Sequence, residues 1–324
     1  MNSILNKYLK VFSSKHLRYD RAHGKAPHKP ILLLSILQTV LNGFINENRI
    51  YITPELVAQF KANWALLVVT NHECKFALPY YHLIGDKFWK LVPKSGYENI
   101  IQLKSSMRSF SNLNAAVEYA SMDDDLWILI NNKESNLILQ QYLLDEYFAE
   151  TKQGFSKSIN YSSEILDRIE NSILHESADE YKKEIKSFIQ KNEVEEVFLR
   201  GAIFKREIPK LYNYTCCISG LQINTINNTS MVDACHIIPY SQSYDDTVLN
   251  GICLSPNLHR AFDRYLITIN DDYRVIVSDK FNESGNHLLK PFHNKQIHLP
   301  AETKYLPNIT NLQWHNKQFW TSNR

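Results

Sequence analysis

Two histidines, an asparagine and an aspartate between residues 233 and 269 have the types and spacing of a catalytic or metal-binding centre. The segment reads DACHIIPYSQSYDDTVLNGICLSPNLHRAFDRYLITI, and it places His236, Asn250 and His259 14 and 9 residues apart. Asp263 follows His259 by four residues, so on a helix both side chains project from one face. A neutral imidazole and a carboxylate placed in this way can bind one divalent cation.

The local pattern predicts a strand, a loop, a second strand and a helix around these residues. Apolar residues alternate on both sides of His236, and Pro239 ends that strand. The letters NGICLS predict a second short strand at 250–255. Ser255 is then the N-cap of a helix whose first residue is Pro256. An isolated histidine and acid on a helix are more often a core residue and a surface charge, but the strand histidine and the turn asparagine favour a chemical site.

Three motifs in this order resemble the ββα-metal endonucleases of the HNH class, in particular the restriction-type members. The motifs are HIIP, NGICL and HRAFD, and the resemblance covers residues 205–270. It implies that His236 is the general base that activates a water molecule, and that Asn250 holds the loop and orients this base. It also implies that His259, the last histidine of the catalytic set, binds the metal together with Asp263.

The residue before the proposed base departs from the family pattern. Many HNH members have an acid or a histidine there as a further metal ligand, whereas this chain has Cys235. Asp233, two residues earlier on the same strand face, is therefore the expected third ligand. The resemblance implies one divalent ion, Mg²⁺ or Mn²⁺ first, with Zn²⁺, Ni²⁺ or Co²⁺ as alternatives. Because Cys216 and Cys217 are adjacent and form no Cys-x-x-Cys pair, no structural zinc is expected.

The region 15–95 resembles the amino-terminal DNA-reading domain of HNH restriction proteins, a group that includes domains that bind phosphorothioate DNA. The resemblance rests on RAHGKAPHKPILLLSIL and LPYYHLIGDKFWKL. Residues 1–30 are rich in lysine and arginine, and this basic arm would supply affinity for the DNA backbone. Lys29 lies at the N-terminus of the helix expected at 30–41, a position that favours a phosphate. The aromatic residues of the second motif either line a stacking pocket or pack in the core. The expected DNA-binding residues are Arg18, Arg21, Lys25, Lys29, Tyr81 and His82.

Two further details bear on DNA recognition. The sulfur-binding domains have a Tyr-Pro pair in this segment, whereas here Tyr81 is followed by His82. Recognition of another modification, or of an unmodified sequence, is therefore equally open. Arg260 and Arg264, beside the last nuclease motif, are expected either to contact DNA phosphates or to form surface ion pairs.

The whole chain is predicted to be an α+β protein with a mixed helical and β DNA-recognition domain at 1–151, a helical linker at 152–195 and an HNH nuclease domain at 196–324. Polar residues with sparse apolar ones at helical spacing indicate the linker. Five individual elements are also expected, namely helices at 30–41, from Pro54 onward and at 131–148, and hairpins at 76–92 and 265–278.

The composition indicates a soluble intracellular protein. With 36 basic and 34 acidic residues the formal net charge is only +2. Five cysteines without regular spacing do not describe a disulfide framework, which fits a reducing cytoplasm. The chain shows no secretory signal, and its longest apolar run of about 12 residues is too short to cross a membrane. The four histidines of the tail are expected on the surface or in packing: His287, His293, His298 and His315.

These features predict a site- or modification-directed DNA endonuclease of restriction or phage-defence type, which hydrolyses phosphodiesters with a histidine base and a metal ion. The partner is double-stranded DNA, and cutting both strands with one active site per chain favours a homodimer. A catalytically inactive DNA-binding regulator that retains the HNH shape is the alternative. A nuclease that acts on RNA or as a toxin fits less well with a separate reading domain.

Overall fold

The computed structural model describes residues 2–13, 17, 19–20, 24–103, 105–223, 230–285 and 288–323. Helices predominate in it, and the described strands form small two-stranded antiparallel sheets, which confirms the α+β class. The chain divides into two compact units, Met1–Asp167 and Arg168–Arg324. The division lies inside helix α8 (Ser158–His175) and so within the segment expected to be a linker.

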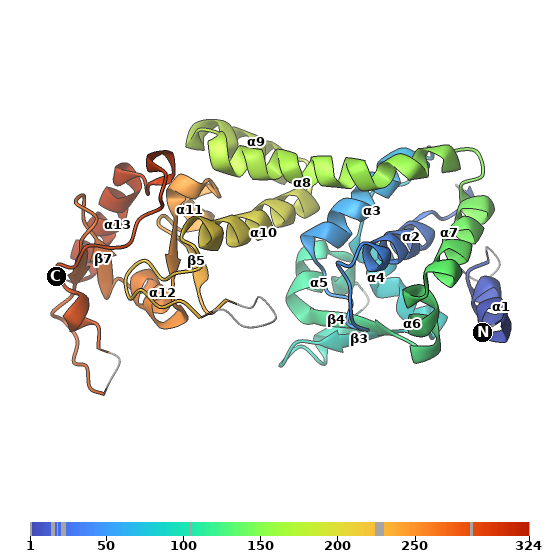
Figure 1. Ribbon diagram of the computed structural model, residues 1–324, viewed down its shortest axis with the longest axis horizontal. Helices are drawn as coiled ribbons and strands as arrows, with labels where there is room; N and C mark the ends of the chain where they lie inside the picture. Colours follow the sequence, from blue (N-terminus) through green and yellow to red (C-terminus); the bar gives the residue numbers. More distant parts are fainter. Residues whose placement is uncertain are drawn as a thin grey trace. The chain divides into compact units, whose positions relative to one another are not determined.

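The first unit is built around α2 (His28–Leu41), which is buried along nearly its whole length because its sequence is apolar on all sides. Helix α3 (Pro54–Leu67) packs against α2 and begins at the expected cap, where the Thr53 hydroxyl accepts a hydrogen bond from Leu56 N at 3.3 Å. The predicted helices after Pro54 and at 131–148 are confirmed. The other helices around this core are α1 (Asn2–Val11), α4 (Ala77–His82), α5 (Phe110–Ala116), α6 (Asp124–Asn131) and α7 (Lys133–Tyr147) (Figure 1).

The predicted hairpin at 76–92 is wrong. Helix α4 and a 3₁₀ turn occupy its first half, because Phe76, Tyr80 and Leu83 recur at helical spacing and are all buried. Strand β3 (Trp89–Pro93) pairs instead with β4 (Val117–Met122), antiparallel and almost 30 residues further along the chain. The unit also contains the short pair β1 (Tyr19–Asp20) and β2 (Gly24–Lys25).

A buried polar network fastens the start of α8 to α2 and α3. Gln38 donates to the Ser158 hydroxyl at 2.8 Å, and the Ser162 hydroxyl donates to Gln59 at 2.9 Å. Asn63 completes the network by donating to the Gln38 side-chain oxygen at 2.8 Å. Because each of these buried amides has a partner, the network fixes the packing of the three helices instead of weakening it.

The second unit contains the predicted succession of strand, loop, strand and helix. Strand β5 (Asp233–His236) pairs antiparallel with β6 (Gly251–Leu254), and His236 lies opposite Gly251. Helix α12 (Pro256–Asp263) follows directly, with Ser255 at the N-cap position. The predicted hairpin at 265–278 is confirmed as β7 (Ile267–Ile269) and β8 (Val275–Val277). The remaining helices of this unit are α9 (Ala178–Gln190), α10 (Val194–Leu211), α11 (Tyr240–Ser243) and α13 (Ile309–Ser322).

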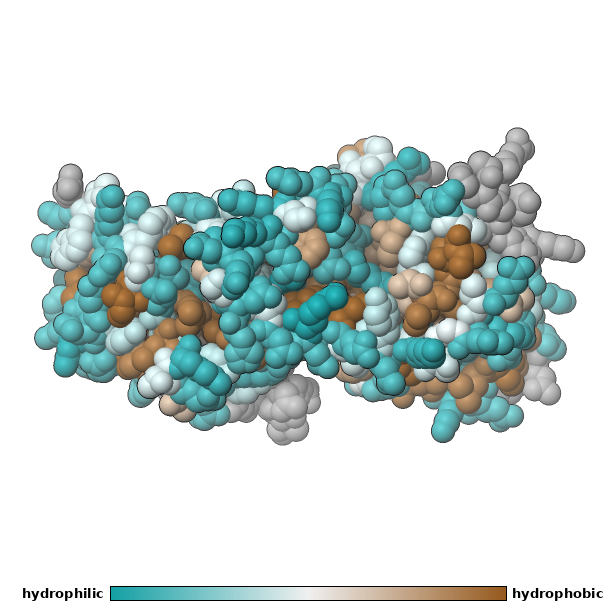
Figure 2. Space-filling view, turned by 90° about the horizontal axis from the view of Figure 1, so that it is seen from above, coloured by the Kyte–Doolittle hydropathy of each residue, from teal (hydrophilic) through white to brown (hydrophobic). Residues whose placement is uncertain are grey.

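On the face shown in Figure 2, hydrophilic residues surround separate hydrophobic patches. None of the helices within the described ranges is long and apolar enough to span a lipid bilayer. All five cysteines are free thiols, and only Cys74 among them is exposed.

One tail histidine, His315 of α13, lies in the core of the second unit. Its ring stacks on Phe262 with centroids 3.6 Å apart, and its nitrogens bond to the Thr268 hydroxyl at 2.8 Å and to the Phe262 carbonyl at 3.2 Å. The residue is only 2% exposed, and this burial lowers its pKa from 6.5 to about 4. The packing role expected for this histidine is confirmed, whereas His287 lies outside the described residues.

Because the pKa of His315 is lower in the folded state, the unfolded chain binds the proton more tightly, and folding must lose stability as the pH falls below 6.5. We expect this histidine to remove about 2 kcal/mol between pH 7 and pH 5. Urea unfolding at both pH values measures the effect. In His315→Gln the pH dependence should shrink by this amount, and an unchanged difference would contradict the assignment.

Candidate active site

His236 stands at the end of β5 in a tightly defined position. Phe204 of α10 stacks on its ring with centroids 4.0 Å apart and planes at 9°. Nε2 of His236 lies 2.8 Å from Oδ1 of Asp246, and the His236 side chain remains 22% exposed. A partly exposed imidazole with one face covered and one nitrogen bonded has its second nitrogen available for proton transfer.

Asn250 is fully buried, and its side chain holds the loop between β5 and β6. Its side-chain oxygen accepts from Ile238 N at 2.9 Å, while its amide donates to the carbonyls of Ile238 and Asp245 at 3.0 Å each. These bonds fix Ile238, at the start of the loop, and Asp245, the residue before Asp246. The sequence-based role for Asn250 was to hold the loop and orient His236, and the bonds found here are to the loop backbone.

Gly251 allows β6 to approach α10 closely. A Cβ at this position would lie 2.8 Å from the Phe204 ring and closer still to Ile208. No side chain fits there unless these residues move, and Phe204 is the ring that covers His236. The glycine beside Asn250 is therefore required by packing, although it has no side chain that could take part in the chemistry.

His259 lies between two carboxylates. Its Nε2 is 3.5 Å from Oδ2 of Asp263, one helical turn further along α12, and its Nδ1 is 3.5 Å from Oδ2 of Asp233 on β5. Two ligand atoms on one ion with bonds of about 2.1 Å are roughly 3.0 to 3.5 Å apart, so the pair of His259 and Asp263 fits a shared cation.

Cys235 joins this pair. Ligand atoms of Cys235, His259 and Asp263 all lie within 4.8 Å of one another. Among the described residues, these three form the one group of at least three His, Cys, Asp or Glu side chains that could hold a metal ion. Asp233, the third ligand expected from the sequence, is outside the group and faces the other nitrogen of His259. Burial raises the pKa of the Cys235 thiol, and the neighbouring Asp263 and Asp233 raise it further.

A divalent cation fits this donor set. The thiol of Cys235 is inaccessible to solvent and lies among negative charges, an environment in which a bound cation would stabilise the thiolate. The combination of sulfur, imidazole and carboxylate suits Zn²⁺, Co²⁺ or Ni²⁺ better than Mg²⁺ or Mn²⁺, which prefer oxygen ligands.

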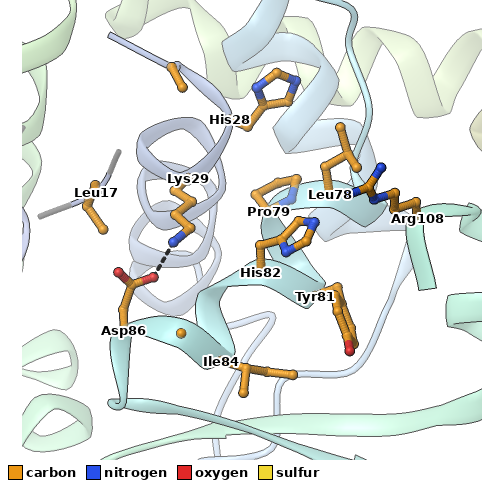
Figure 3. A pocket seen from close by; sticks show the side chains of 12 residues that line it. Leu17, His28, Lys29, Leu78, Pro79, Tyr81, His82, Ile84, Asp86 and Arg108 are labelled. Atoms are coloured by element: carbon orange, nitrogen blue, oxygen red, sulfur yellow. Dashed lines mark hydrogen bonds and ion pairs between the residues drawn. The ribbon is translucent and has the colours of Figure 1, made fainter. Parts of the chain in front are cut away.

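The first unit contains a separate pocket of about 800 Å³ between α2, α4 and the turn after α4 (Figure 3). Tyr81 and His82 both line it, whereas the neighbouring Tyr80, Phe88 and Trp89 are core residues exposed by 2% or less. The Tyr81 hydroxyl donates to the Ile101 carbonyl at 3.0 Å. The remaining walls are a mixture of polar and apolar side chains, among them His28, Leu78, Pro79, Ile84 and Arg108.

The basic residues expected to bind DNA differ in their surroundings. Lys29 lines the pocket, but its ammonium forms an ion pair with Asp86, which Figure 3 shows as a dashed line. Its charge is therefore already neutralised at short range. Arg260 and Arg264 are exposed on and just after α12. Arg18 and Arg21 lie outside the described residues, as does the side chain of Lys25.

Four residues of this site were not identified from the sequence: Phe204, Asp246, the Cys235 thiol as a donor, and Tyr181, whose hydroxyl donates to Asp246 at 3.2 Å. Asp246 had a visible signal, because the pair Asp245-Asp246 stands between the first two motifs. Phe204 and Tyr181 had none, since both come from helices far upstream of the motifs.

Comparison with known proteins identifies the C-terminal motifs. Residues 216–270 match the family of HNH endonucleases. A solved structure described as a modification dependent TagI restriction endonuclease is 19% identical, over 36% of this chain and 37% of its own length, with a TM-score of 0.29. No curated protein matches. The stretch that contains His236, Asn250, His259 and Asp263 is accordingly an HNH endonuclease domain.

Proposed function

We propose that this protein is a metal-dependent DNA endonuclease of restriction or phage-defence type, in which the first unit selects the DNA and the HNH domain cuts it. The observation that carries the proposal is the adjacency of two centres. His236, bonded to Asp246, is the next residue along β5 after Cys235 of the metal-ligand group. His236 is the last residue of β5, and a phosphodiester bound at this end of the strand is proposed to reach both the base and the cation.

In this proposal His236 is the general base. It removes a proton from the water molecule that attacks phosphorus, and its partial exposure leaves room for that water and for the phosphate. Asn250 keeps the loop in place through Ile238 and Asp245. The 3′-oxygen leaves after attack, and its negative charge must be neutralised for the reaction to proceed at a useful rate.

His259 and Asp263 would hold the cation, with Cys235 as the third ligand. When bound, the cation would supply positive charge to the phosphate and to the leaving oxygen. Asp233 accepts the Nδ1 proton of His259 and so orients the ring, which is the arrangement found behind most metal-binding histidines. In this proposal Asp233 thus orients the metal-binding histidine instead of binding the ion.

DNA selection is assigned to the pocket of the first unit and to its surroundings. The pocket has polar and apolar walls in similar measure, with Tyr81 and His82 on one side and the exposed Arg108 at its edge. These groups suit a nucleotide, which presents an aromatic face and an anionic phosphate. In this proposal Lys29, which is ion-paired with Asp86, forms part of the pocket wall. Arg260 and Arg264 are available for flanking phosphates at the nuclease domain.

The test is digestion of matched phage genomes or plasmids that are unmodified, methylated, hydroxymethylated or phosphorothioated, each with Mn²⁺, Co²⁺, Zn²⁺ or Mg²⁺ added. We expect one substrate class to be cut and the others to be spared, and we expect no cutting in the presence of a chelator. Linear products at early times indicate paired active sites, as in a homodimer, whereas nicked circles indicate single cuts. Metal-independent cutting would contradict the proposal.

Experiments with the same substrates distinguish the endonuclease from the alternative function, a catalytically inactive DNA-binding regulator. The presence of Cys235 where many family members have an acid favours an HNH domain that binds DNA without cutting it. Such a regulator would bind one substrate class tightly in a fluorescence anisotropy assay and leave it intact with every metal. An RNA-directed nuclease would instead cut RNA and spare all four DNA classes.

A further inference from the structure

The Asp246 carboxylate, which no sequence motif singled out, is buried and uses both of its oxygens. Oδ1 lies 2.8 Å from Nε2 of His236, and Oδ2 accepts from the Tyr181 hydroxyl at 3.2 Å. The residue is 1% exposed. An ionised carboxylate can only accept hydrogen bonds, and a buried one is stable only when donors face it. Two donors converge on this group, and one of them is the imidazole of the proposed base.

Tyr181 is itself firmly placed. It lies in the first turn of α9, which begins with a reciprocal capping arrangement between Ser177 and Glu180. The guanidinium of Arg200 lies 5.1 Å from the centre of its ring and forms an ion pair with Glu184 at 2.7 Å. Burial raises the pKa of Tyr181, and the Asp246 charge raises it further, so the hydroxyl keeps its proton and acts as a donor.

Helix α9 also contacts the loop at a second point. Lys182 lies 4.0 Å from Asp245, the residue next to Asp246. Consecutive residues of α9 thus face consecutive acids of the loop that runs from β5 to β6. Helix α9 belongs to the segment expected to be a linker, yet Tyr181 and Ile185 are completely buried within the second unit. This helix is therefore an integral part of the nuclease domain.

We propose that Asp246 and Tyr181 are positioning residues for His236: Asp246 holds the imidazole in one orientation and one tautomer, and Tyr181 holds Asp246. The proposal rests on the role of His236 as the base. Neither residue is assigned a contact with the substrate or the metal ion, and both act through the histidine.

The physical argument has two parts. Phe204 stacks on the ring and fixes its plane, but a stacked ring can still turn within that plane. The bond from Nε2 to Asp246 removes this freedom. Because the carboxylate accepts only, Nε2 of the neutral ring carries the proton, and Nδ1 is the nitrogen free to take a proton from water. Without Asp246 the proton could occupy either nitrogen.

The first measurement determines the tautomer directly. The ¹⁵N chemical shifts of a neutral imidazole show which nitrogen carries the proton, and a His236→Gln sample identifies the signal. At alkaline pH, without metal or DNA, we expect wild-type His236 to carry its proton on Nε2. In Asp246→Asn, which keeps the shape but removes the charge, we expect this preference to be lost. A mixture of tautomers in the wild type would overturn the proposal.

The second measurement is kinetic. Asp246→Asn is expected to lower kcat about 100-fold or more, the range assigned to a positioned general base, and to leave KM and DNA affinity unchanged. Tyr181→Phe removes one hydrogen bond and is expected to lower kcat about 2- to 10-fold. A merely structural role would lower the unfolding midpoint without changing the tautomer. Full kcat in Asp246→Asn would overturn the positioning role alone and leave the proposed nuclease function standing.

Tyr212→Phe is the matched control. Tyr212 is another buried tyrosine of the second unit, and no described residue bonds to its hydroxyl. Loss of this hydroxyl removes an unsatisfied polar group, so folding should be unaffected or slightly improved and kcat should not change. If wild-type His236 shows the fixed tautomer but the protein cuts no nucleic acid, this result would instead contradict the proposed function. The positioning role of Asp246 and Tyr181 would then be contradicted as well.

Discussion

Replacing His236 with alanine is expected to reduce DNA cleavage by about 100- to 10,000-fold while DNA binding is retained. The imidazole is the proposed base, and none of the other described residues bonded to Asp246 could replace it, since Tyr181 keeps its proton. Binding should survive because the predicted reading pocket is in the first unit. Single-turnover cleavage and fluorescence anisotropy measure the two quantities on the same substrate.

The control for this experiment is His298→Ala. His298 is an exposed histidine of the same unit, and its backbone amide, rather than its ring, donates to the Cys217 carbonyl at 2.7 Å. We expect this variant to cut at the wild-type rate. Undiminished cleavage by His236→Ala would rule out the assigned base, and loss of binding would mean that His236 contributes to the DNA contact.

The second large effect concerns the metal. His259→Ala is expected to weaken divalent metal binding by more than about 100-fold and to abolish cleavage, because His259 is central to the donor group and is supported by Asp233. Calorimetric titration of the metal-free protein with Co²⁺ measures binding independently of activity. Asp263→Ala should have a similar effect. Asp233→Asn should weaken binding by a smaller factor of about 10 to 100.

The same titration tests the thiol. Thiolate bound to Co²⁺ produces an intense near-ultraviolet charge-transfer band, which imidazole and carboxylate ligands do not produce. We expect this band in the wild type and its loss in Cys235→Ala, in which weaker visible bands from the remaining ligands persist. The buried and unpaired Cys217 provides the control, because Cys217→Ala should retain the band. A wild-type complex without the band would exclude Cys235 as a ligand.

The core of the site could be predicted because it is local in the sequence. Strands β5 and β6 and helix α12 follow one another within about 30 residues, so strand alternation, a turn glycine and a proline at the helix start were enough to place His236, Asn250 and His259. The spacing of His259 and Asp263 likewise required only helical geometry.

The parts that were missed depend on long-range packing. Tyr181 reaches Asp246 across 65 residues, and the Phe204 ring reaches His236 from a separate helix. Neither contact leaves a local pattern. The wrong hairpin at 76–92 has a similar origin, since the aromatic and aliphatic residues after Gly85 do form a strand, but its partner strand begins only at Val117. The residue types indicated a strand there and could not identify its partner.

The close approach of Gly251 to Phe204 and Ile208 has a consequence for sequence variation. One aromatic ring covers the histidine and also excludes a side chain from position 251, so these positions cannot change independently. Among related chains, a larger residue at 251 should occur together with smaller ones at 204 or 208, and the loss of the ring should be matched by another group over the histidine. Covariation at this triplet would therefore mark a nuclease centre even where the motif letters have diverged.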